Sequence, residues 1–296
     1  MGFSWYDSRA GCRFVNDMLI FLFKRINIFR RLAPKGIFMQ AHFRKTDFIP
    51  QPKAAGDANK KIVIAVDGPA ASGKGTLARK LAERLGYAYL DTGALYRAVG
   101  LATLESGGNP DSWQDVQTAV AIITRNLTPE LLASPALRAP DVSEAASKVA
   151  AIPEVRQALL DYQRAFAANP PGNVGGAVLD GRDIGTVICP NADVKFFVTA
   201  SVEERARRRF EELKATSADK GAILSQSQVL ADLKRRDERD QTRATAPTKS
   251  ASDAYVLDTT TLNAQQALDQ AISVIRAKFL SETNDNAAAM RKPPQP

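Results

Sequence analysis

The sequence predicts an α/β fold in which helices cover a central parallel sheet, and three observations lead to this prediction. The chain of 296 residues is 45% hydrophobic, which is enough to bury a sizeable core. After residue 60, short apolar runs alternate with segments whose apolar residues recur at helical spacing. A glycine-rich turn joins the first apolar run to the first of these helical segments. We therefore expect one α/β unit with insertions.

The first predicted strand is the run IVIAV at residues 62–66, whose consecutive apolar side chains are typical of a strand buried on both faces of a parallel sheet. The turn after it places Gly68, Gly73 and Lys74 in the pattern G-x-x-x-x-G-K. In this pattern backbone N–H groups surround a polyphosphate and the lysine reaches its outer phosphates. A glycine-rich turn that binds nothing is the alternative, and it leaves Lys74 unexplained.

The first predicted helix begins at Lys74. Apolar residues recur at helical spacing through LARKLAERL at residues 77–85, and Gly86 supplies a stop. The N-terminus of this helix directs its partial positive charge at the same anion as the turn.

A second predicted strand, residues 87–90, runs into Asp91, Thr92 and Gly93 and then into a helix that carries Arg97. Ligands bind at the carboxyl ends of strands in open α/β sheets, so a hydroxyl and an arginine here indicate a second ligand that carries phosphate. Exposed arginines are common, so a surface role for Arg97 is the alternative.

Two further strands are predicted at residues 177–179 and 194–198. The first ends in the charged run DGRD at residues 180–183, which again places charge at the ligand-binding edge of the sheet. The second precedes Ser201, a predicted helix cap.

Two arginine-rich helices follow, VEERARRRFEELK from residue 202 and LADLKRRDERDQTR from residue 230. Interleaved charges usually mark a solvated, ion-paired helix face, which is the alternative to a functional lid. Phosphoryl transfer depends on aligning two phosphates and neutralising their charge, and arginine does this without deprotonating. A phosphate acceptor is largely dianionic at neutral pH, so no general base is required.

The charge distribution argues against general nucleic-acid binding by the α/β unit. The net charge is +8, but residues 1–60 hold 11 basic and 4 acidic side chains, while the rest of the chain holds 29 and 28. Cys12 and Cys189 are the only cysteines and His42 is the only histidine. These counts argue against a disulfide framework, a histidine-based triad and a His-rich zinc site in the α/β unit, and favour a reducing compartment.

Residues 1–60 form a basic extension that is predicted to lie outside the α/β unit. Its apolar stretch at residues 18–23 is too short to cross a bilayer, and no small-residue cleavage site follows, so we do not expect secretion. Four explanations of the extension remain open: it lies on an anionic membrane surface, it is a transit peptide, it is disordered, or the translation start was assigned upstream of the true one. We favour the last explanation, with Met39 as the candidate true start. Residues 284–296 are predicted to be a disordered tail.

Six ordered blocks make the chain resemble the bacterial cytidylate kinases, which are nucleoside monophosphate kinases of the P-loop class. They are GPAASGKGT, LDTGALYR, EAASKVAAIPEVRQALLDYQRAF, LDGRDIGT, KRRDERDQTRATAP and DAYVLDTT, and they cover most of residues 61–262. This order is far more specific than a P-loop alone. The resemblance implies a three-layer P-loop fold with a central parallel sheet. It places a kinase domain at residues 61–283, an acceptor-binding insertion at about 100–172 and a helical lid at about 202–246.

The resemblance implies ATP-dependent phosphorylation of CMP and dCMP, with ATP and Mg²⁺ as cofactors. Lys74 would contact the ATP phosphates and the Thr76 hydroxyl would lie near the metal. Gly75 departs from the common GK[ST] form, so we expect waters and nucleotide phosphates to supply most metal ligands. The implied ATP-binding residues are Gly68, Pro69, Ala70, Ala71, Ser72, Gly73, Lys74, Gly75 and Thr76.

The resemblance also implies contacts with each part of the acceptor nucleotide, and it assigns lid arginines to ATP. Lys74, Arg182, Arg208 and Arg209 are the implied catalytic residues, the last two from the lid. The acceptor residues are Ser147, Arg156 and Asp183 at the cytosine edge, Arg236 and Asp240 at the ribose, and Thr92, Arg97, Arg182 and Arg243 at the phosphate.

The chemistry of these side chains agrees with cytosine. A carboxylate at Asp183 can accept from the cytosine amino group, and Arg156 can donate to the ring carbonyl. Uracil presents a carbonyl in place of the amino group, so it would lose a hydrogen bond and be repelled. We therefore expect a preference for CMP over UMP.

The chain departs from many family members between Asn126 and Arg138, where they carry a small β insertion and only NLTPELLASPALR remains here. Base contacts made by that insertion cannot be transferred to this chain. The alternative functions are a kinase for UMP or AMP and, from a different class, a non-catalytic ATP-binding module. We expect small-molecule partners only, no nucleic acid, no membrane span, a monomer and a cytoplasmic location.

Overall fold

The computed structural model describes residues 60–216 and 225–289, which belong to one compact unit. The predicted extension, apart from Lys60, and residues 217–224 of the predicted lid lie outside these described residues. Among the helices in the described ranges, none is long and apolar enough to span a bilayer.

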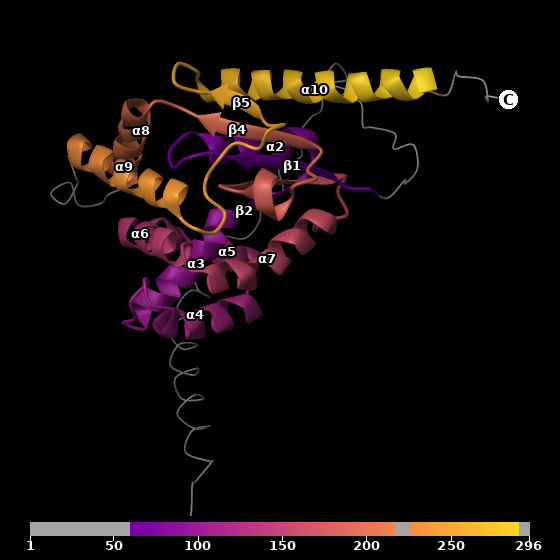
Figure 1. Cartoon of the computed structure of the whole chain (residues 1–296). Helices are drawn as coiled ribbons and strands as arrows, with labels where there is room; N and C mark the ends of the chain where they lie inside the picture. Colours follow the sequence, from indigo (N-terminus) through magenta and orange to yellow (C-terminus); the bar gives the residue numbers. More distant parts are fainter. Residues whose placement is uncertain (1–59, 217–224, 290–296) are drawn as a thin grey trace, which may run out of the picture. The chain divides into compact units, whose positions relative to one another are not determined.

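A parallel sheet of five strands forms the middle of the fold (Figure 1), in the order β2-β3-β1-β4-β5. The predicted parallel α/β architecture is thus confirmed, together with the four strands that the apolar runs indicate. The fifth strand was not predicted; it lies at the sheet edge and leaves Tyr255 and Val256 exposed. The strands are β1 (Ile62–Asp67), β2 (Ala88–Asp91), β3 (Gly176–Gly181), β4 (Val194–Thr199) and β5 (Tyr255–Asp258).

Helices cover both faces of the sheet, and this explains why β1 is apolar from Ile62 to Val66. Ile64 and Val66 pack in one hydrophobic cluster with α2 and α10, while Ala65 packs in another with α7 and the short turn η4. Figure 1 shows α10 on one side of the sheet and α7 on the other. These elements are α2 (Lys74–Leu85), α7 (Pro153–Ala168), η4 (Ile184–Ile188) and α10 (Ala264–Ala289).

The C-terminal helix is longer than the sequence indicates. Residues 284–289, of sequence NDNAAA, belong to α10 rather than to a disordered tail. Adding residues to an existing helix costs little, and alanine has the highest helix propensity. Residues 290–296 of the predicted tail lie outside the described residues.

The predicted acceptor-binding insertion consists of helices around a second hydrophobic core, which includes Leu95, Val99, Val116 and Leu159. Short helical turns, not strands, occupy the segment from Asn126 to Arg138, where the chain lacks the family's β insertion. The elements are α3 (Thr92–Glu105), α4 (Trp113–Arg125), α5 (Pro129–Leu132), η3 (Pro135–Arg138) and α6 (Pro140–Val149).

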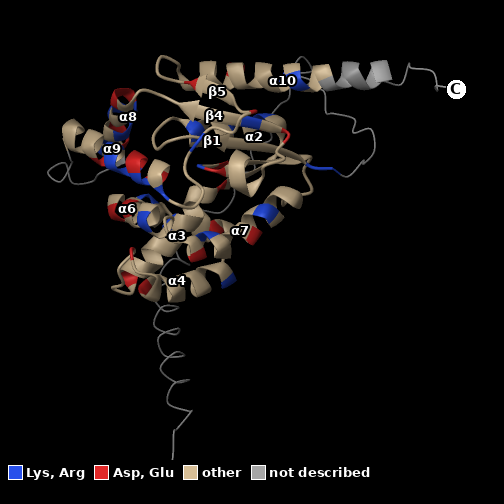
Figure 2. Cartoon of the chain, in the orientation of Figure 1, with Lys and Arg blue, Asp and Glu red and all other residues tan. Residues whose placement is uncertain are grey.

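The two arginine-rich helices, α8 (Val202–Thr216) and α9 (Gln226–Thr242), pack against each other and against Ala70 of the glycine-rich loop. The Ser201 hydroxyl accepts from the Glu204 N–H at 3.3 Å, which confirms the predicted cap of α8. Figure 2 shows basic and acidic residues interspersed along both helices.

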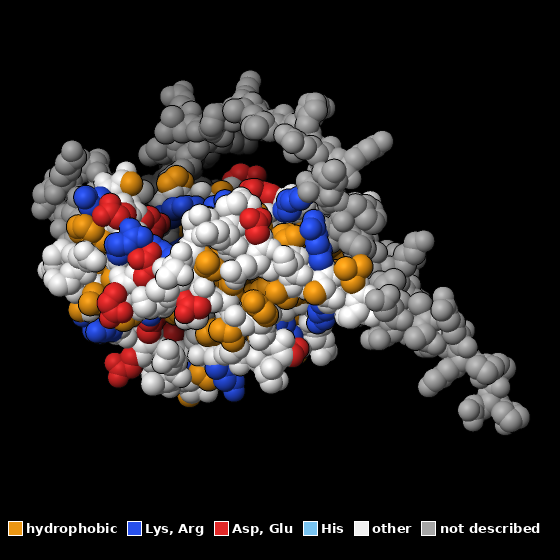
Figure 3. Space-filling view, turned by 90° about the horizontal axis from the view of Figure 1, so that it is seen from above, with side chains coloured by type: hydrophobic (Ala, Val, Ile, Leu, Met, Phe, Trp, Pro, Cys, Tyr) orange, Lys and Arg blue, Asp and Glu red, His pale blue; other side chains and the backbone are white. Residues whose placement is uncertain are grey.

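The surface of the described residues carries both signs of charge. On the face drawn in Figure 3, basic and acidic side chains are intermixed with apolar ones. This pattern agrees with the near balance of charge after residue 60.

Candidate active site

The loop between β1 and α2 has the backbone conformation of a phosphate-binding loop. Gly68 has φ 147°, and a Cβ atom there would lie 2.0 Å from the Val198 carbonyl oxygen, so only glycine fits. Gly73 has φ 88° and directly precedes α2. The loop thereby turns the chain onto a helix N-terminus, where backbone N–H groups face an anion. At the first helical position, burial and the nearby Arg182 lower the pKa of Lys74 to about 8.

The structure explains why glycine replaces the usual serine or threonine at position 75. A Cβ atom on Gly75 would lie 2.8 Å from Oδ2 of Asp180, so a larger residue would displace that carboxylate. Asp180 is 4% exposed and accepts from the Tyr89 hydroxyl at 3.2 Å. Burial and the neighbouring Asp91 raise the pKa of Asp180 to about 6.

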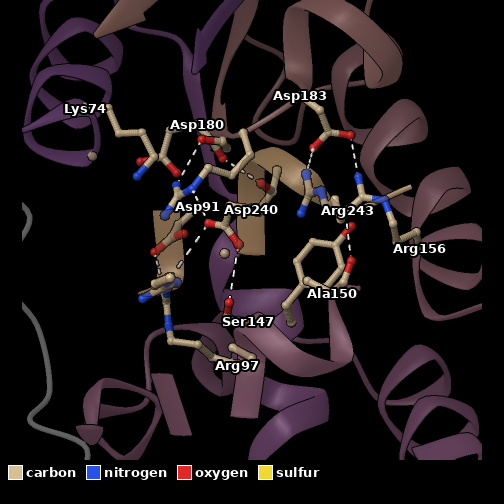
Figure 4. A pocket seen from close by; sticks show the side chains of 18 residues that line it. Lys74, Asp91, Arg97, Ser147, Ala150, Arg156, Asp180, Asp183, Asp240 and Arg243 are labelled. Atoms are coloured by element: carbon tan, nitrogen blue, oxygen red, sulfur yellow. Dashed lines mark hydrogen bonds and ion pairs between the residues drawn. The ribbon is translucent and has the colours of Figure 1, made fainter. Parts of the chain in front are cut away.

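A pocket opens beside this loop, at the carboxyl ends of β2 and β3 (Figure 4). It contains all nine residues assigned to the acceptor nucleotide, although they lie far apart in the sequence. The lining residues are Lys74, Gly75, Asp91, Thr92, Gly93, Tyr96, Arg97, Ala146, Ser147, Ala150, Arg156, Asp180, Gly181, Arg182, Asp183, Arg236, Asp240 and Arg243.

One end of the pocket brings Lys74, Asp91, Arg97 and Asp180 together (Figure 4). Asp91 accepts from Arg97 Nη2 at 2.6 Å and from the Ala94 N–H at 3.1 Å, so it caps α3 and orients the arginine. Burial opposes ionisation of Asp91, but Arg97 and Lys74 outweigh it and lower the pKa. The Thr92 hydroxyl, which was assigned to the acceptor phosphate, donates to the Asp180 carbonyl oxygen at 2.6 Å.

The opposite end holds a buried ion pair between Asp183 and Arg156, which are 5% and 7% exposed. The Arg156 guanidinium also lies 5.6 Å from the centre of the Tyr96 ring. Arg243 lies here as well, with Nη2 at 3.6 Å from Asp183 Oδ1. The structure thus brings together the two side chains predicted to read cytosine.

Arg243 does not lie beside Arg97, although both were assigned to the acceptor phosphate. Its Nε donates to the Ala246 carbonyl oxygen at 2.6 Å, and Ala246 has the left-handed φ of 51°. This turn after α9 directs the guanidinium of Arg243 toward Asp183 (Figure 4).

Asp240 lies between the two ends of the pocket and joins three elements (Figure 4). Its Oδ1 accepts from the Ser147 hydroxyl at 3.3 Å, and its Oδ2 accepts from Arg182 Nε at 3.1 Å. Arg236 is more distant, with Nε at 4.0 Å from Asp240 Oδ2. Ser147 therefore pairs with the residue assigned to the ribose, although it was itself assigned to the cytosine edge.

The charges and unpaired donors of the pocket suit an anion. Six cationic side chains and four carboxylates line it, which leaves an excess of two positive charges. Three buried guanidinium nitrogens in the pocket have no hydrogen-bond acceptor among the described residues: Nε of Arg97, Nε of Arg236 and Nη2 of Arg243. Buried donors are normally satisfied, so these three indicate a ligand rich in acceptor oxygens.

A second pocket, of about 540 Å³, lies along the start of α2 and α8, on residues other than those of the first. Arg208 reaches into this region, donating from Nη1 to Thr259 Oγ1 at 3.0 Å and from Nη2 to the Thr259 carbonyl oxygen at 2.5 Å. The lining residues are Gly73, Thr76, Leu77, Glu204, Arg207, Arg208, Thr259, Thr260, Thr261, Leu262, Asn263, Ala264 and Ala267.

The remaining lid arginines differ in their surroundings. Arg205 is buried, pairs with Asp237 at 2.7 Å and donates to the Ala70 carbonyl oxygen of the loop at 3.2 Å. The side chain of Arg207 is 57% exposed and, within the described ranges, forms an ion pair with Glu204. Arg209 pairs with Glu212 at 2.8 Å. Burial and the nearby Arg182 lower the pKa of Arg236 to about 10, and Arg209 adds a smaller effect in the same direction.

Sequence reasoning left several pocket residues without a role. Asp91 and Asp180 follow predicted strands, and this position beside a phosphate-binding loop was the signal that could have identified them as pocket residues. Tyr96 lies in the quoted block LDTGALYR, and Thr259 in DAYVLDTT, but neither motif shows which side chains face a pocket.

This fold and its phosphate-binding loop define a P-loop phosphotransferase. The cytidylate kinase family model matches residues 64–277, and the chain belongs to this family. A cytidylate kinase of Paramagnetospirillum magneticum is 56% identical over 216 residues, which span 73% of this chain and 98% of that protein. Cytidylate kinases of Rhodospirillum rubrum and Granulibacter bethesdensis are 54% and 52% identical, over 98% and 99% of their own lengths.

Proposed function

We propose that this protein transfers the γ-phosphoryl group of ATP to the phosphate of CMP or dCMP, forming ADP and CDP or dCDP. The observation that carries the proposal is the cation-rich pocket beside the phosphate loop, closed at its far end by Asp183 and Arg156. Membership of the cytidylate kinase family supports the same reaction. The match to cytidylate kinases does not favour UMP or AMP as the acceptor.

The acceptor phosphate binds at the end of the pocket nearest Lys74. Arg97 and Arg182 lie there with Thr92, and Arg243 completes the set if its guanidinium turns from Asp183. A phosphate oxygen of CMP attacks the γ-phosphorus of ATP as the bond to ADP breaks. The arginines neutralise the charge on the transferred group, which is the main requirement of this reaction.

The base binds at the other end. Asp183 and Arg156 pair with each other in the structure, and a cytosine ring would receive one contact from each. Its amino group donates to Asp183, and its ring carbonyl accepts from Arg156. The ribose then lies between the two ends, beside Asp240, Arg236 and Ser147.

ATP binds through the loop from Gly68 to Thr76 and places its nucleoside in the second pocket, whose volume suits a small ligand. Arg208 is already at this pocket and lies beside Gly73, since its Nη1 would be 3.7 Å from a Cβ atom there. Arg209 follows Arg208 on the same helix and pairs with Glu212. We assign Lys74, Arg182, Arg208 and Arg209 to the phosphoryl group in transfer.

The residues present suit Mg²⁺, because the pocket offers the hard oxygen donors of Asp91 and Asp180 beside Lys74. No group of three or more metal-ligating side chains occurs among the described residues, so water and phosphate oxygens would complete the coordination. Thr76 lines the second pocket and remains our predicted neighbour of the metal. When bound, Mg²⁺ would neutralise phosphate charge and orient the ATP phosphates.

We further propose that the protein is a cytoplasmic monomer. The low cysteine content supports a reducing compartment. Light scattering should then give the mass of one chain, 32.1 kDa.

The Asp183→Asn variant tests whether Asp183 selects cytosine over uracil. An amide has the shape of the carboxylate but can donate to the uracil carbonyl, so the kcat/KM ratio of CMP to UMP should fall about a hundredfold. Glu144→Gln is the control, because it removes an ion pair between α6 and α9 to Arg239 outside the pocket. An unchanged ratio in Asp183→Asn would remove Asp183 from base selection.

A further inference from the structure

Asp67 is a buried carboxylate for which the transfer reaction has no use. It is the last residue of β1 and directly precedes Gly68, the first residue of the phosphate loop. It is 4% exposed, and in the sheet it is paired with Gly181 of β3 on one side and Phe197 of β4 on the other. The sheet therefore fixes its backbone from both sides.

Both carboxylate oxygens of Asp67 hold the segment that follows Asp183. Oδ1 accepts from the Ile184 N–H at 2.8 Å, and Oδ2 accepts from the Gly185 N–H at 2.7 Å. These N–H groups open the turn η4, immediately after Asp183. The side chain of Ile184 is itself fully buried. The start of η4 is thus held by the buried side chain of Ile184 and by two hydrogen bonds to the Asp67 carboxylate.

We propose that Asp67 is a positioning residue for base selection, because its carboxylate fixes the start of η4 and with it the direction in which Asp183 meets the acceptor base. This inference rests on the proposed function, in which Asp183 chooses CMP over UMP. One side chain then connects the strand that enters the ATP-binding loop to the loop that reads the acceptor.

The role depends on the ionised carboxylate. Protonation would place a hydrogen on one oxygen, and that oxygen would then accept poorly from its N–H partner. Burial raises the pKa of Asp67 to about 7, while the bonds from Gly185 and Ile184 oppose this rise. The groups that face Asp67 are Asp183 and Arg182 beside η4, Cys189 after it, and the stem of Lys195 on β4.

The test replaces Asp67 with asparagine, which keeps the shape but turns an amide NH₂ toward one of the two N–H donors. CMP and UMP are compared on one preparation, because a ratio of kcat/KM values does not depend on the folded fraction. We expect the CMP to UMP ratio to fall about tenfold through a higher KM for CMP, with the KM for ATP changed less than about twofold.

Asp193→Asn is the matched control. Asp193 Oδ2 accepts from the Val63 N–H at 2.8 Å, near the opposite end of the same strand, whereas the N–H groups of Ile184 and Gly185 are held by Asp67. Its replacement should leave the ratio unchanged.

An unchanged CMP to UMP ratio in Asp67→Asn, or equal losses of kcat/KM for CMP and ATP, would overturn the inference and leave the proposed function intact. A wild-type protein that does not phosphorylate CMP would instead overturn the proposed function.

The wild-type protein offers a second test if Asp67→Asn does not fold. CMP and UMP share the same phosphate ionisation, so the ratio of their kcat/KM values cancels it. We expect this ratio to fall as the pH is lowered through about 7, where Asp67 takes up a proton. A ratio that stays constant from about pH 8 to about pH 6 would contradict the assignment.

Discussion

At Lys74, the proposed function needs a positive charge, whereas burial disfavours that charge. Lys74 must be positive to hold ATP phosphates, yet burial and Arg182 lower its pKa to about 8, against the opposing effect of Asp180 and Asp91. The free protein therefore holds a lysine that can lose its proton at mildly alkaline pH. Bound phosphates would favour the charged form.

This predicts an alkaline limb in the rate. Because kcat/KM reports groups of the free enzyme, kcat/KM for ATP should fall as the pH rises through about 8. Arginine stays protonated over this range, so Lys74→Arg should lose the limb even if its rate is lower. A wild-type profile that is flat to about pH 9.5 would show that Lys74 does not titrate in this way.

Some residues of the site could be predicted from local sequence and others could not. Lys74 and Gly68 belong to a pattern with one physical meaning, since a polyphosphate needs closely spaced backbone N–H groups. The bonds from Asp67 to η4 join residues 117 and 118 positions apart, so no local pattern indicates them. The clash that requires Gly75 likewise depends on Asp180, a residue of another strand.

At the scale of elements, one arginine attaches the lid helices to the phosphate loop. Arg205 of α8 pairs with Asp237 of α9 and donates to the Ala70 carbonyl oxygen. Its side chain is 7% exposed and that of Asp237 is 13% exposed. The pair therefore fixes the base of the lid where the ATP phosphates are expected.

Removing this arginine should destabilise the protein more than removing its exposed neighbour. Arg205→Ala leaves Asp237 buried without its partner, so the free energy of unfolding should fall by about 3 to 5 kcal/mol. Arg207→Ala removes only an exposed pair with Glu204 and should change stability little. Urea unfolding of both variants measures the difference. Equal midpoints would contradict a structural role for Arg205.

The sequence predicts which elements exist better than it predicts which faces they bury. Helical spacing and charge predict α8 and α9, but the cluster RARRR does not show which arginine lies inside. Packing of Ala206 with Ala70 sets the rotation of α8, and this buries Arg205 and exposes Arg207. Similarly, the apolar run of β5 is only three residues long, and its place in the sheet comes from pairing with β4.

At the scale of the whole molecule, the described fold contains both pockets. Among the described residues, those that line the pockets lie at or after Gly73, and the family match begins at residue 64. Lys60 pairs with Asp193 at 2.7 Å, so the first described residue still contacts the fold. A chain that begins at Lys60 therefore keeps all the described residues that line the two pockets.

A protein that begins at Lys60 should remain active. Its kcat and KM for CMP should stay within about twofold of the full chain, because all the described residues that line either pocket are kept. The two proteins are compared in the same steady-state assay and by thermal unfolding. A large loss of activity in the shorter protein would give residues 1–59 a part in the reaction.

The most direct test of the account is the choice of acceptor by the purified full-length protein. A coupled assay of ADP release, with ATP and Mg²⁺, is run with CMP, dCMP, UMP, AMP and GMP in turn. The account predicts turnover with CMP and dCMP well above that with UMP, because Asp183 accepts from the cytosine amino group and repels the uracil carbonyl. Turnover with another acceptor alone, or ATP binding without turnover for any acceptor, would contradict it.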